Sequence, residues 1–454
     1  MTILWAKQVL TSEGWQKDVS ITIAVDGTIS ALTCDSEPTG KQFDILLPAP
    51  ANTHSHAFQR AMAGMTERRG PDPRDSFWTW REVMYRFVDL LTPDDIEAIT
   101  AFLYMEMLEA GFGAVAEFHY LHHGQNGQAY DNIAETAHRI AAAANHTGIG
   151  LTLLPVLYSQ GGCDGRGLVG GQKRFGNNQD QFSELFEASK TAVAALAPDC
   201  RVGAAAHSLR AITPEELSFA TKLAPDAPFH IHIAEQDAEI TEVLAHHNQR
   251  PVEWLIGNHD VNDRWCLVHA TQMTSDETSA LAKSGAVAAL CPITESSLGD
   301  GIFNAREYLS AGGAFSIGSD SNVRISLTEE LRTLEYSQRL KHRERAVLAN
   351  AEHSNGHVLL QGAAQGGAQA CGRNSSEIAV GKLADIFALN GSVPDLIGKQ
   401  GDMLLDSFIF SGSSNMITDV WSAGRHMVCG GTHINRETIV KDYEKVILSL
   451  GQRL

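Results

Sequence analysis

The sequence lacks any run of apolar residues as long as the ~18 that a membrane-spanning helix needs, although 43% of its 454 residues are hydrophobic. It also lacks an excess of positive charge, because 54 acidic side chains outnumber 35 basic ones and leave a net charge of −19. A protein of that charge repels nucleic acid and anionic membranes, so we expect neither as a partner. The first residues, MTILWAKQVL, lack the charged start and long apolar core of a signal peptide.

Paired cysteines are missing as well. The seven cysteines are an odd number, they are dispersed along the chain, and no two of them form a CxxC motif. Dispersed thiols are typical of a reducing compartment, so we expect a cytoplasmic location. With 20% charged residues the composition is globular, and the length allows one large domain and a smaller one.

Both ends of the chain have the alternating pattern of β-strands. The segments that show it are VSITIAVDGTISAL (19–32), ADIFALN (384–390) and DVWSAGRHMVCGGTH (419–433). In the first of these, the Asp-Gly pair at 26–27 is a hairpin turn signal. We therefore expect residues 1–48 and 376–454 to form one small β-sandwich domain together.

Residues 49–375 alternate short apolar strands with helical segments. PDDIEAITAFLYMEMLEAG (93–111), for example, has an acidic first turn, helical apolar spacing and a terminal glycine. Eight such strands predict a (β/α)8 barrel of the TIM type, with a doubly wound open sheet as the alternative. The expected strands are DILLPAP (44–50), GAVAEFHY (113–120), GLTLLPVLY (150–158), VGAAAHSL (202–209), FHIHIAE (229–235), WCLVHAT (265–271), AVAALCP (286–292) and AFSIGSDS (314–321).

Polar residues recur at the carboxyl ends of these strands and favour the barrel. A barrel brings all strand ends to one face, where the active site of this fold lies. For any one of these residues, a hydrogen-bonded core side chain is the simpler explanation, but six strands that end in the same way favour a shared site. The residues are His54, His56, His119, Tyr120, His207, His232, Glu235, His269 and Asp320.

The segment ANTHSHAFQR (51–60) places two histidines one residue apart, and in a strand such residues point to the same side. His54 and His56 can therefore converge on a metal ion, together with His232 and Asp320 from two other strands. These are the ligand types of a catalytic Zn²⁺ site, and they also suit Fe²⁺ or Mn²⁺. His230 shares the face of His232, so one of the two would be the ligand and the other would pack.

A metal of this kind lowers the pKa of water from 15.7 to roughly 7, which provides a nucleophile at neutral pH. Asp320 or His269 could take the proton of that water, and Glu235 could carry a proton to a leaving nitrogen. The fourth strand, VGAAAHSL, contains no lysine that could bridge two metals as a carbamate. We therefore expect one metal per chain.

The motifs THSH, HIAEQ, LVHA and GSD, in this order within a barrel, resemble the amidohydrolase superfamily. EIAVGKLADIFALN resembles the strand with which that superfamily returns to its β-domain, so the resemblance covers almost the whole chain. Its single-metal, lysine-free form is similar to the deaminase branch.

A finer resemblance rests on the segments NTHSHAFQRAMAG, SFWTWREVMYR, EFHYLHH, GGQKRF, AHSLRA, HIHIAEQ and GSDSNVRISLTEELR. Together they resemble the formimidoylglutamate deiminase family. This resemblance implies hydrolysis of N-formimidoyl-L-glutamate to N-formyl-L-glutamate and ammonia in histidine degradation, by a zinc-dependent homodimer. It also implies that polar groups at Gln59, Arg81, Tyr120, His207 and Arg210 meet the carboxylates of this small acidic substrate. PAPANTHSH departs from the family, which has a bulkier residue and a proline before the asparagine.

Two other functions remain open. A deaminase of a heterocycle such as guanine, cytosine or a pterin would keep the metal site, but the arginines at 81 and 210 favour an acidic substrate. A catalytically inactive scaffold would have lost ligands, whereas every expected ligand type is present. We expect the glycine-rich segment 161–176 to be a mobile loop at the active site, and the paired histidines 122–123 and 246–247 to lie at the surface.

Overall fold

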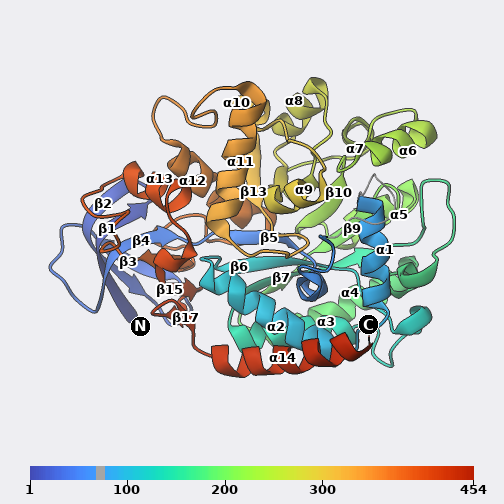
Figure 1. Ribbon diagram of the computed structural model, residues 1–454, viewed down its shortest axis with the longest axis horizontal. Coiled ribbons are helices and arrows are strands. Elements are labelled where there is room, and N and C mark those ends of the chain that lie inside the picture. The colour runs from blue at the N-terminus through green and yellow to red at the C-terminus, as the bar shows by residue number, and fades with distance from the viewer. Residues whose placement is uncertain (68–76, 454) are drawn as a thin grey trace.

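The alternation of apolar strands and helices produces a closed parallel barrel in the computed structural model, which describes residues 1–67 and 77–453 (Figure 1). Each barrel strand pairs with its neighbours in parallel, and β6 pairs with both β5 and β7, which closes the ring. The barrel strands among the described residues are β5 (Ala51–Ser55), β6 (Ala114–His119), β7 (Gly150–Leu157), β9 (Ala204–Ser208), β10 (Phe229–Ile233), β11 (Trp265–His269), β12 (Val287–Leu290) and β13 (Ala314–Ile317), with the short β8 (Arg201–Val202) beside β7. The predicted (β/α)8 barrel is confirmed.

Helices follow the strands and cover the outside of the barrel. Several begin at a threonine whose hydroxyl accepts a backbone N–H, as Thr92 does for the helix predicted at 93–111. The helices are α1 (Phe77–Val88), α2 (Pro93–Glu109), α3 (Glu135–Thr147), α4 (Gln179–Ala194), α5 (Pro214–Leu223), α6 (Asp237–His247), α7 (Pro251–Asn258), α8 (Ser275–Ser284), α9 (Pro292–Leu298), α10 (Ala305–Ser310), α11 (Leu327–His342) and α12 (Asn355–Ala370), with the 3-10 turns η1 (Ala57–Met62), η2 (Gln125–Gly127) and η3 (Gly170–Arg174).

A second sheet combines the two ends of the chain, as predicted, and lies at one side of the barrel (Figure 1). Its strands form one continuous sheet in the order β17-β16-β15-β14-β4-β1-β2-β3, antiparallel except where β1 meets β4. It encloses a hydrophobic cluster of its own, which includes Leu4, Ile21, Ile386 and Trp421. The strands are β1 (Thr2–Thr11), β2 (Gly14–Ile23), β3 (Ile29–Thr33), β4 (Lys41–Pro48), β14 (Ile386–Leu389), β15 (Ile417–Ser422), β16 (Arg425–Cys429) and β17 (Thr432–His433).

The prediction that DILLPAP (44–50) is the first barrel strand is wrong. Most of this run belongs to β4, which lies between β1 and β14 in the terminal sheet, and the barrel begins at β5. The two strands are separated by only two residues, Ala49 and Pro50. An apolar run that is buried on both faces has the same pattern in either sheet, so hydrophobicity alone could not assign it.

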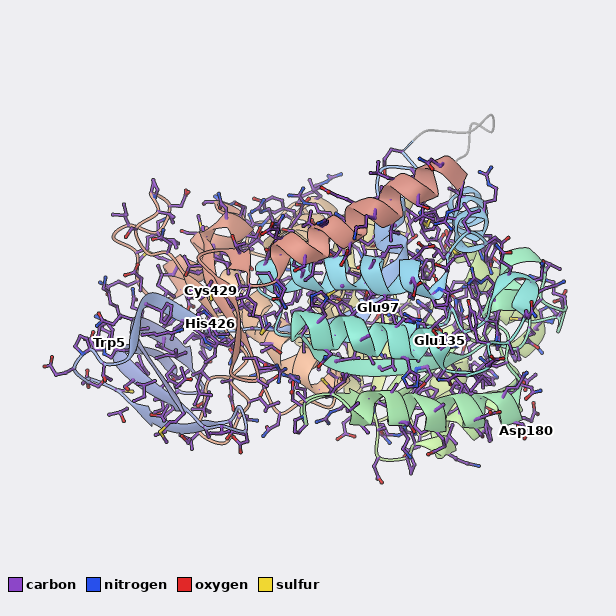
Figure 2. All side chains as sticks on the ribbon, turned by 90° about the horizontal axis from the view of Figure 1, so that it is seen from below. Trp5, Glu97, Glu135, Asp180, His426 and Cys429 are labelled. Atoms are coloured by element: carbon purple, nitrogen blue, oxygen red, sulfur yellow. The ribbon has the colours of Figure 1, made fainter. Side chains whose placement is uncertain are left out.

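The last part of the chain returns to the barrel. After β17, α14 (Arg436–Arg453) lies along α2, where Tyr443 stacks on Phe102 with ring centroids 3.9 Å apart. Figure 2 shows α14 above α2, and below α2 it shows α3 and then α4. The remaining elements are α13 (Asp402–Phe410), which packs on α11 and α12, and η4 (Ser414–Met416). Every helix within 1–67 and 77–453 is too short or too polar to span a lipid bilayer.

Candidate active site

Three strand ends bring together the four side chains that were predicted as metal ligands. His54 and His56 come from β5 and the residue after it, His232 from β10, and Asp320 from the segment that follows β13. The Nε2 atoms of His54 and His232 are 2.9 Å apart. Asp320 Oδ1 lies 3.4 Å from His54 Nε2 and 3.2 Å from His56 Nε2. Four potential donor atoms therefore face one point at the carboxyl end of the barrel.

Backbone carbonyls orient two of these imidazoles. Nδ1 of His56 lies 3.1 Å from the carbonyl oxygen of Phe118, and Nδ1 of His232 lies 2.9 Å from that of His207. Because a carbonyl oxygen can only accept, each Nδ1 must carry the hydrogen. Each Nε2 then directs its lone pair toward the cluster, which is the tautomer that a metal ligand needs.

The protonation states of the cluster also suit a metal. Burial lowers the pKa of His54 to about 3 and that of His232 well below its usual range, so both are neutral at pH 7. Burial would raise the pKa of Asp320, but its contacts with His54 and His56 outweigh this and hold the pKa well below the usual range. Neutral imidazoles and an ionised carboxylate are the donor states of a Zn²⁺ site, so these residues fit a divalent metal.

The backbone brings Asp320 to His54 by a close approach. The N–H groups of Ser319 and Asp320 both donate to the carbonyl oxygen of His54, at 3.1 and 2.9 Å. A side chain on Gly318 would lie 2.9 Å from the backbone nitrogen and oxygen of His54, so this contact requires glycine. Asp320 itself is in the left-handed region at φ 47°, as are Ala234 at φ 51° and His269 at φ 69°. Such backbone strain is concentrated at functional sites.

His269 lies at the edge of the same cluster. One possible ligand atom of His269 and one each of His54, His232 and Asp320 all lie within 4.8 Å of one another. His269 Nε2 is 3.8 Å from Asp320 Oδ2 and 3.9 Å from Glu235 Oε1. Its other nitrogen, Nδ1, lies 3.4 Å from Glu295 Oε1. His269 is thus placed to carry a proton, and the carboxylate of Glu295 contacts the other side of its ring.

Buried carboxyl groups make this end of the site acidic. Burial alone would lower the pKa of His269, but Glu235, Glu295 and Asp320 outweigh it and raise the pKa to about 10. Burial raises the pKa of Glu235 itself, which is the direction of shift that favours a general acid. Asp300, on the loop after α9, has its pKa raised to about 9 by burial and by the nearby charge of Glu235.

Guanidinium groups lie in the wall of the same cavity. Arg81 on α1 donates from Nη2 to the hydroxyl of Tyr158 over 3.2 Å, and Arg210 is buried just after β9. Burial, followed by the charges of these two arginines, lowers the pKa of His207 well below its usual range. The cavity wall therefore carries both the acidic groups of the ligand cluster and the two basic arginines.

Nearly all the predicted site residues line this one cavity. They are His56, Gln59, Arg81, Tyr120, His207, Arg210, His232, Glu235, His269 and Asp320, and His54 lies fully buried behind them. Gln59 Nε2 donates to the hydroxyl of Tyr120 over 2.9 Å, which joins two of the predicted substrate-binding residues. The lining residues that the sequence analysis did not single out are Trp80, Met84, Tyr85, Tyr158, Phe175, Leu298 and Ser321.

The structure corrects one prediction about histidines and decides another. His122 and His123 were expected at the surface but are buried, where each Nε2 donates to a backbone carbonyl. Between His230 and His232, the pairing of β10 with β9 shifts register, and His230 turns away to donate to the carbonyl oxygen of Ala370. His232 therefore faces the site and His230 packs in the core.

Another group of possible ligands, Asp419, His426 and Cys429, lies on the terminal sheet, where Figure 2 labels the histidine and the cysteine. Asp419 Oδ1 is 2.7 Å from His426 Nε2, and the ammonium of Lys41 is 3.1 Å from His426 Nδ1. Both ring nitrogens thus already have partners, and one partner is a cation. This group is accounted for as a hydrogen-bonded surface network.

Comparisons with known proteins agree with this site. Residues 45–427 match the model of the amidohydrolase family, and residues 1–42 match that of the formimidoylglutamate deiminase HutF N-terminal domain. The chain is 45% identical to formimidoylglutamate deiminase of Pseudomonas aeruginosa, over 98% of this chain and 99% of the relative. It is 27% identical to a 5-methylthioadenosine/S-adenosylhomocysteine deaminase of Natronomonas pharaonis, over 95% and 88% of the two chains.

Solved structures show the same architecture. An amidohydrolase from Brucella melitensis superposes with a TM-score of 0.95 at 46% identity, covering 99% of this chain and 100% of the other. An adenosine deaminase from Xanthomonas campestris, with bound zinc, shares the fold at a TM-score of 0.83 and 20% identity, over 99% and 98% of the chains. The chain belongs to the amidohydrolase family, in the group of formimidoylglutamate deiminase.

Proposed function

We propose that the chain hydrolyses N-formimidoyl-L-glutamate to N-formyl-L-glutamate and ammonia, as a step in histidine degradation. The observation that carries this proposal is that the wall of one cavity carries groups of both charges, Arg81 and Arg210 together with Glu235 and Asp320. The substrate has the complementary charges, with two carboxylates on the glutamate part and a cationic amidine at the reacting carbon. The 45% identity to a formimidoylglutamate deiminase over almost the entire chain supports the same reaction.

Zinc is the proposed metal, with one ion per chain held by His54, His56, His232 and Asp320. When bound, it supplies a water molecule whose pKa is near ~7 instead of 15.7. The same donor types accept Fe²⁺ or Mn²⁺, so metal analysis of the protein as purified is the direct measurement. We expect one equivalent of zinc per chain, and loss of that equivalent in the variant His232→Ala.

The residues around the metal site have distinct proposed roles in proton transfer. Asp320, whose carboxylate is ionised, accepts the proton that the attacking water loses, and His269, whose Nε2 lies 3.8 Å from Asp320 Oδ2, orients that water. Glu235 delivers a proton to the amidine nitrogen, which leaves as ammonia when the C–N bond breaks. The raised pKa of Glu235 supports this role, because burial favours the protonated form of the carboxyl group.

The two arginines in the cavity wall would bind the glutamate part. Arg81 and Arg210 can meet carboxylates with two parallel N–H donors each, a geometry that lysine does not offer. Tyr120, whose hydroxyl accepts from Gln59, and His207 complete the proposed contacts. Because the net charge of −19 repels an acidic substrate at long range, these local cations must capture it, within the ~8 Å over which salt does not screen them.

The proposal is tested by ammonia release from the purified, zinc-loaded protein, with N-formimidoyl-L-glutamate and guanine assayed in parallel. Release from the glutamate compound alone is the expected result. Release from guanine alone would retain the metal chemistry and overturn the substrate, and a zinc-loaded protein that is silent on both would overturn the proposed reaction.

The proposed partner is thus a small acidic molecule, and the family likeness supports a homodimer. Light scattering on the purified protein should give twice the mass of one chain. A cytoplasmic location is also proposed, supported by the cysteines, all seven of which lie in the described residues as free thiols.

A further inference from the structure

Tyr158 lies in the cavity wall immediately after β7, and its side chain has the hydrogen-bonding arrangement of a substrate ligand. It is 2% exposed, and it was not singled out by any sequence motif. Its hydroxyl oxygen lies 3.2 Å from Nη2 of Arg81 and 3.2 Å from Nε2 of Gln172. A guanidinium and an amide NH₂ can only donate, so the phenol oxygen accepts both of these bonds.

A count of hydrogens limits where the Tyr158 O–H group can point. A hydroxyl oxygen accepts at its two lone pairs and donates one hydrogen. Because Arg81 and Gln172 occupy the acceptor positions, the hydrogen must point away from both of them. Since Tyr158 lines the cavity, the O–H group can then be directed into it.

The orientation of Gln172 is set by its own environment. Its Oε1 accepts the backbone N–H of Val169 over 3.1 Å, which leaves Nε2 to face Tyr158. Gln172 lies in η3, within the glycine-rich segment 161–176. Two residues later, the buried guanidinium of Arg174 donates to the backbone carbonyls of His123 and Leu91, at 2.8 and 3.0 Å, and to that of Val88. This segment is therefore held against the carboxyl end of α1, the helix that also carries Arg81.

We propose that the Tyr158 hydroxyl donates a hydrogen bond to a carboxylate of the substrate, and that Gln172 is the positioning residue that aims it. This inference rests on the proposed function, since it requires a substrate with carboxylates. An anion fits this point of the cavity because Arg81 brings a positive charge to the same oxygen and polarises its O–H bond. His207, a proposed substrate contact, packs edge-on against Tyr158 with ring centroids 4.7 Å apart.

The test combines a variant with substrate analogues. Tyr158→Phe keeps the ring and removes the hydroxyl, so KM for N-formimidoyl-L-glutamate should rise roughly 10- to 100-fold, the effect of losing one hydrogen bond to a charged group. The kcat value should change by less than about threefold, because the proposed hydrogen bond is to a carboxylate of the substrate and not to the reacting carbon. The assay is repeated with two analogues in which one or the other substrate carboxylate is replaced by a neutral carboxamide.

If Tyr158 binds one carboxylate, the Tyr158→Phe penalty should largely disappear for the analogue that lacks it and persist for the other analogue. An equal penalty for all three compounds would mean a structural role and would overturn the inference, as would the absence of any penalty. Tyr308→Phe is the matched control, because Tyr308 is also buried and its hydroxyl donates to the backbone carbonyls of Ala286 and Ala314.

Gln172→Leu provides a second test that leaves Tyr158 intact. It should raise KM by a smaller factor and add nothing further in the Tyr158→Phe background, because both changes act through one hydroxyl. Additive effects would overturn the positioning role. Wild-type protein that is zinc-loaded but does not turn over N-formimidoyl-L-glutamate would overturn the proposed function together with this inference, whereas active wild type with an unaffected Tyr158→Phe variant would overturn the inference alone.

Discussion

At the residue scale, the sequence predicted the side chains that strand ends deliver to the site. His54, His56, His232 and Asp320 could be found because the carboxyl ends of parallel strands meet at one face of a barrel. Glu295 and Gln172 could not be found in this way, because they reach the site from a short helix and from an irregular segment. Their positions depend on how those segments pack against the rest of the chain, and the local sequence pattern does not determine that packing.

Arg210→Met is the residue change that most directly tests substrate capture. Loss of the buried guanidinium should raise KM for the acidic substrate roughly 10- to 100-fold, since it removes charge-assisted hydrogen bonds, while zinc content is retained. Steady-state kinetics and metal analysis measure the two effects. Arg166→Met is the control, because Arg166 is an exposed residue that pairs with Asp164 and Glu242. Unchanged kinetics in Arg210→Met would remove this arginine from carboxylate binding.

Glu295 offers a separate prediction about His269. Its Oε1 accepts the backbone N–H of Cys291 over 2.9 Å and lies 3.4 Å from His269 Nδ1, so it orients the ring and favours a hydrogen on Nδ1. Glu295→Gln should lower kcat roughly 10- to 100-fold with little change in KM, the usual effect of losing such a supporting carboxylate.

Glu330→Gln is the matched control for Glu295→Gln. Glu330 is also a buried carboxyl group and accepts the N–H of Ile293 at the same helix, α9. If both variants lower kcat equally, the effect comes from disturbing α9 and the orienting role of Glu295 is wrong. Metal content, measured in parallel, should stay at one equivalent in both variants.

At the element scale, regular elements with local signals were predicted and elements that depend on partners were not. The helix expected at 93–111 is α2, because its cap, acidic first turn and terminal glycine are all local features. The segment 44–50 was assigned to the wrong sheet, since the choice between β1 and β13 as neighbours is made by distant parts of the chain. The register shift that separates His230 from His232 is likewise a property of the pairing between β9 and β10.

The cap of α2 gives a prediction for stability. Thr92 Oγ1 accepts the N–H of Asp95 over 3.2 Å, and Asp95 Oδ2 accepts the N–H of Thr92 over 3.0 Å. Thr92→Ala should lower the free energy of unfolding by about 1 kcal/mol, because the first turn of the helix loses a hydrogen-bond acceptor. Thr191→Ala is the control, since its hydroxyl bonds within the exposed face of α4. Denaturant unfolding of both variants should show the loss only at the cap.

At the scale of the whole molecule, a buried ion-pair network joins the barrel to the terminal sheet. Arg373, which follows α12, donates to Asp385 before β14 at 2.6 and 2.9 Å and to Asp199 before β8 at 2.8 Å. Asp199 also accepts from Arg425 of β16, at 2.6 and 2.8 Å. The sequence predicted that the two chain ends meet, but these four residues are too far apart in the chain for their pairing to be read from it.

Acid should weaken this network in a defined direction. Burial would raise the pKa of Asp199, but Arg425 and Arg373 outweigh it and lower the pKa to about 2. The unfolded carboxyl group titrates near ~3.9, so the folded state gains stability from Asp199 above that pH and loses it as the pH falls toward 2. Asp199→Asn should flatten the fall in unfolding midpoint over this interval, measured against wild type at constant ionic strength.

Arg373→Met is the strongest test that the network holds the molecule together. The change would leave Asp385 and Asp199 buried with one cation fewer between them, which costs about 3–5 kcal/mol in comparable sites. The unfolding midpoint should fall accordingly, and the terminal sheet should become accessible to protease before the barrel does. Arg306→Met, which breaks an exposed pair with Glu344, should have almost no effect, because exposed ion pairs contribute little. An equal fall in the unfolding midpoint of the two variants would mean that the buried Arg373 network stabilises the protein no more than an exposed ion pair does. The barrel and the sheet would then be held together by their apolar contacts.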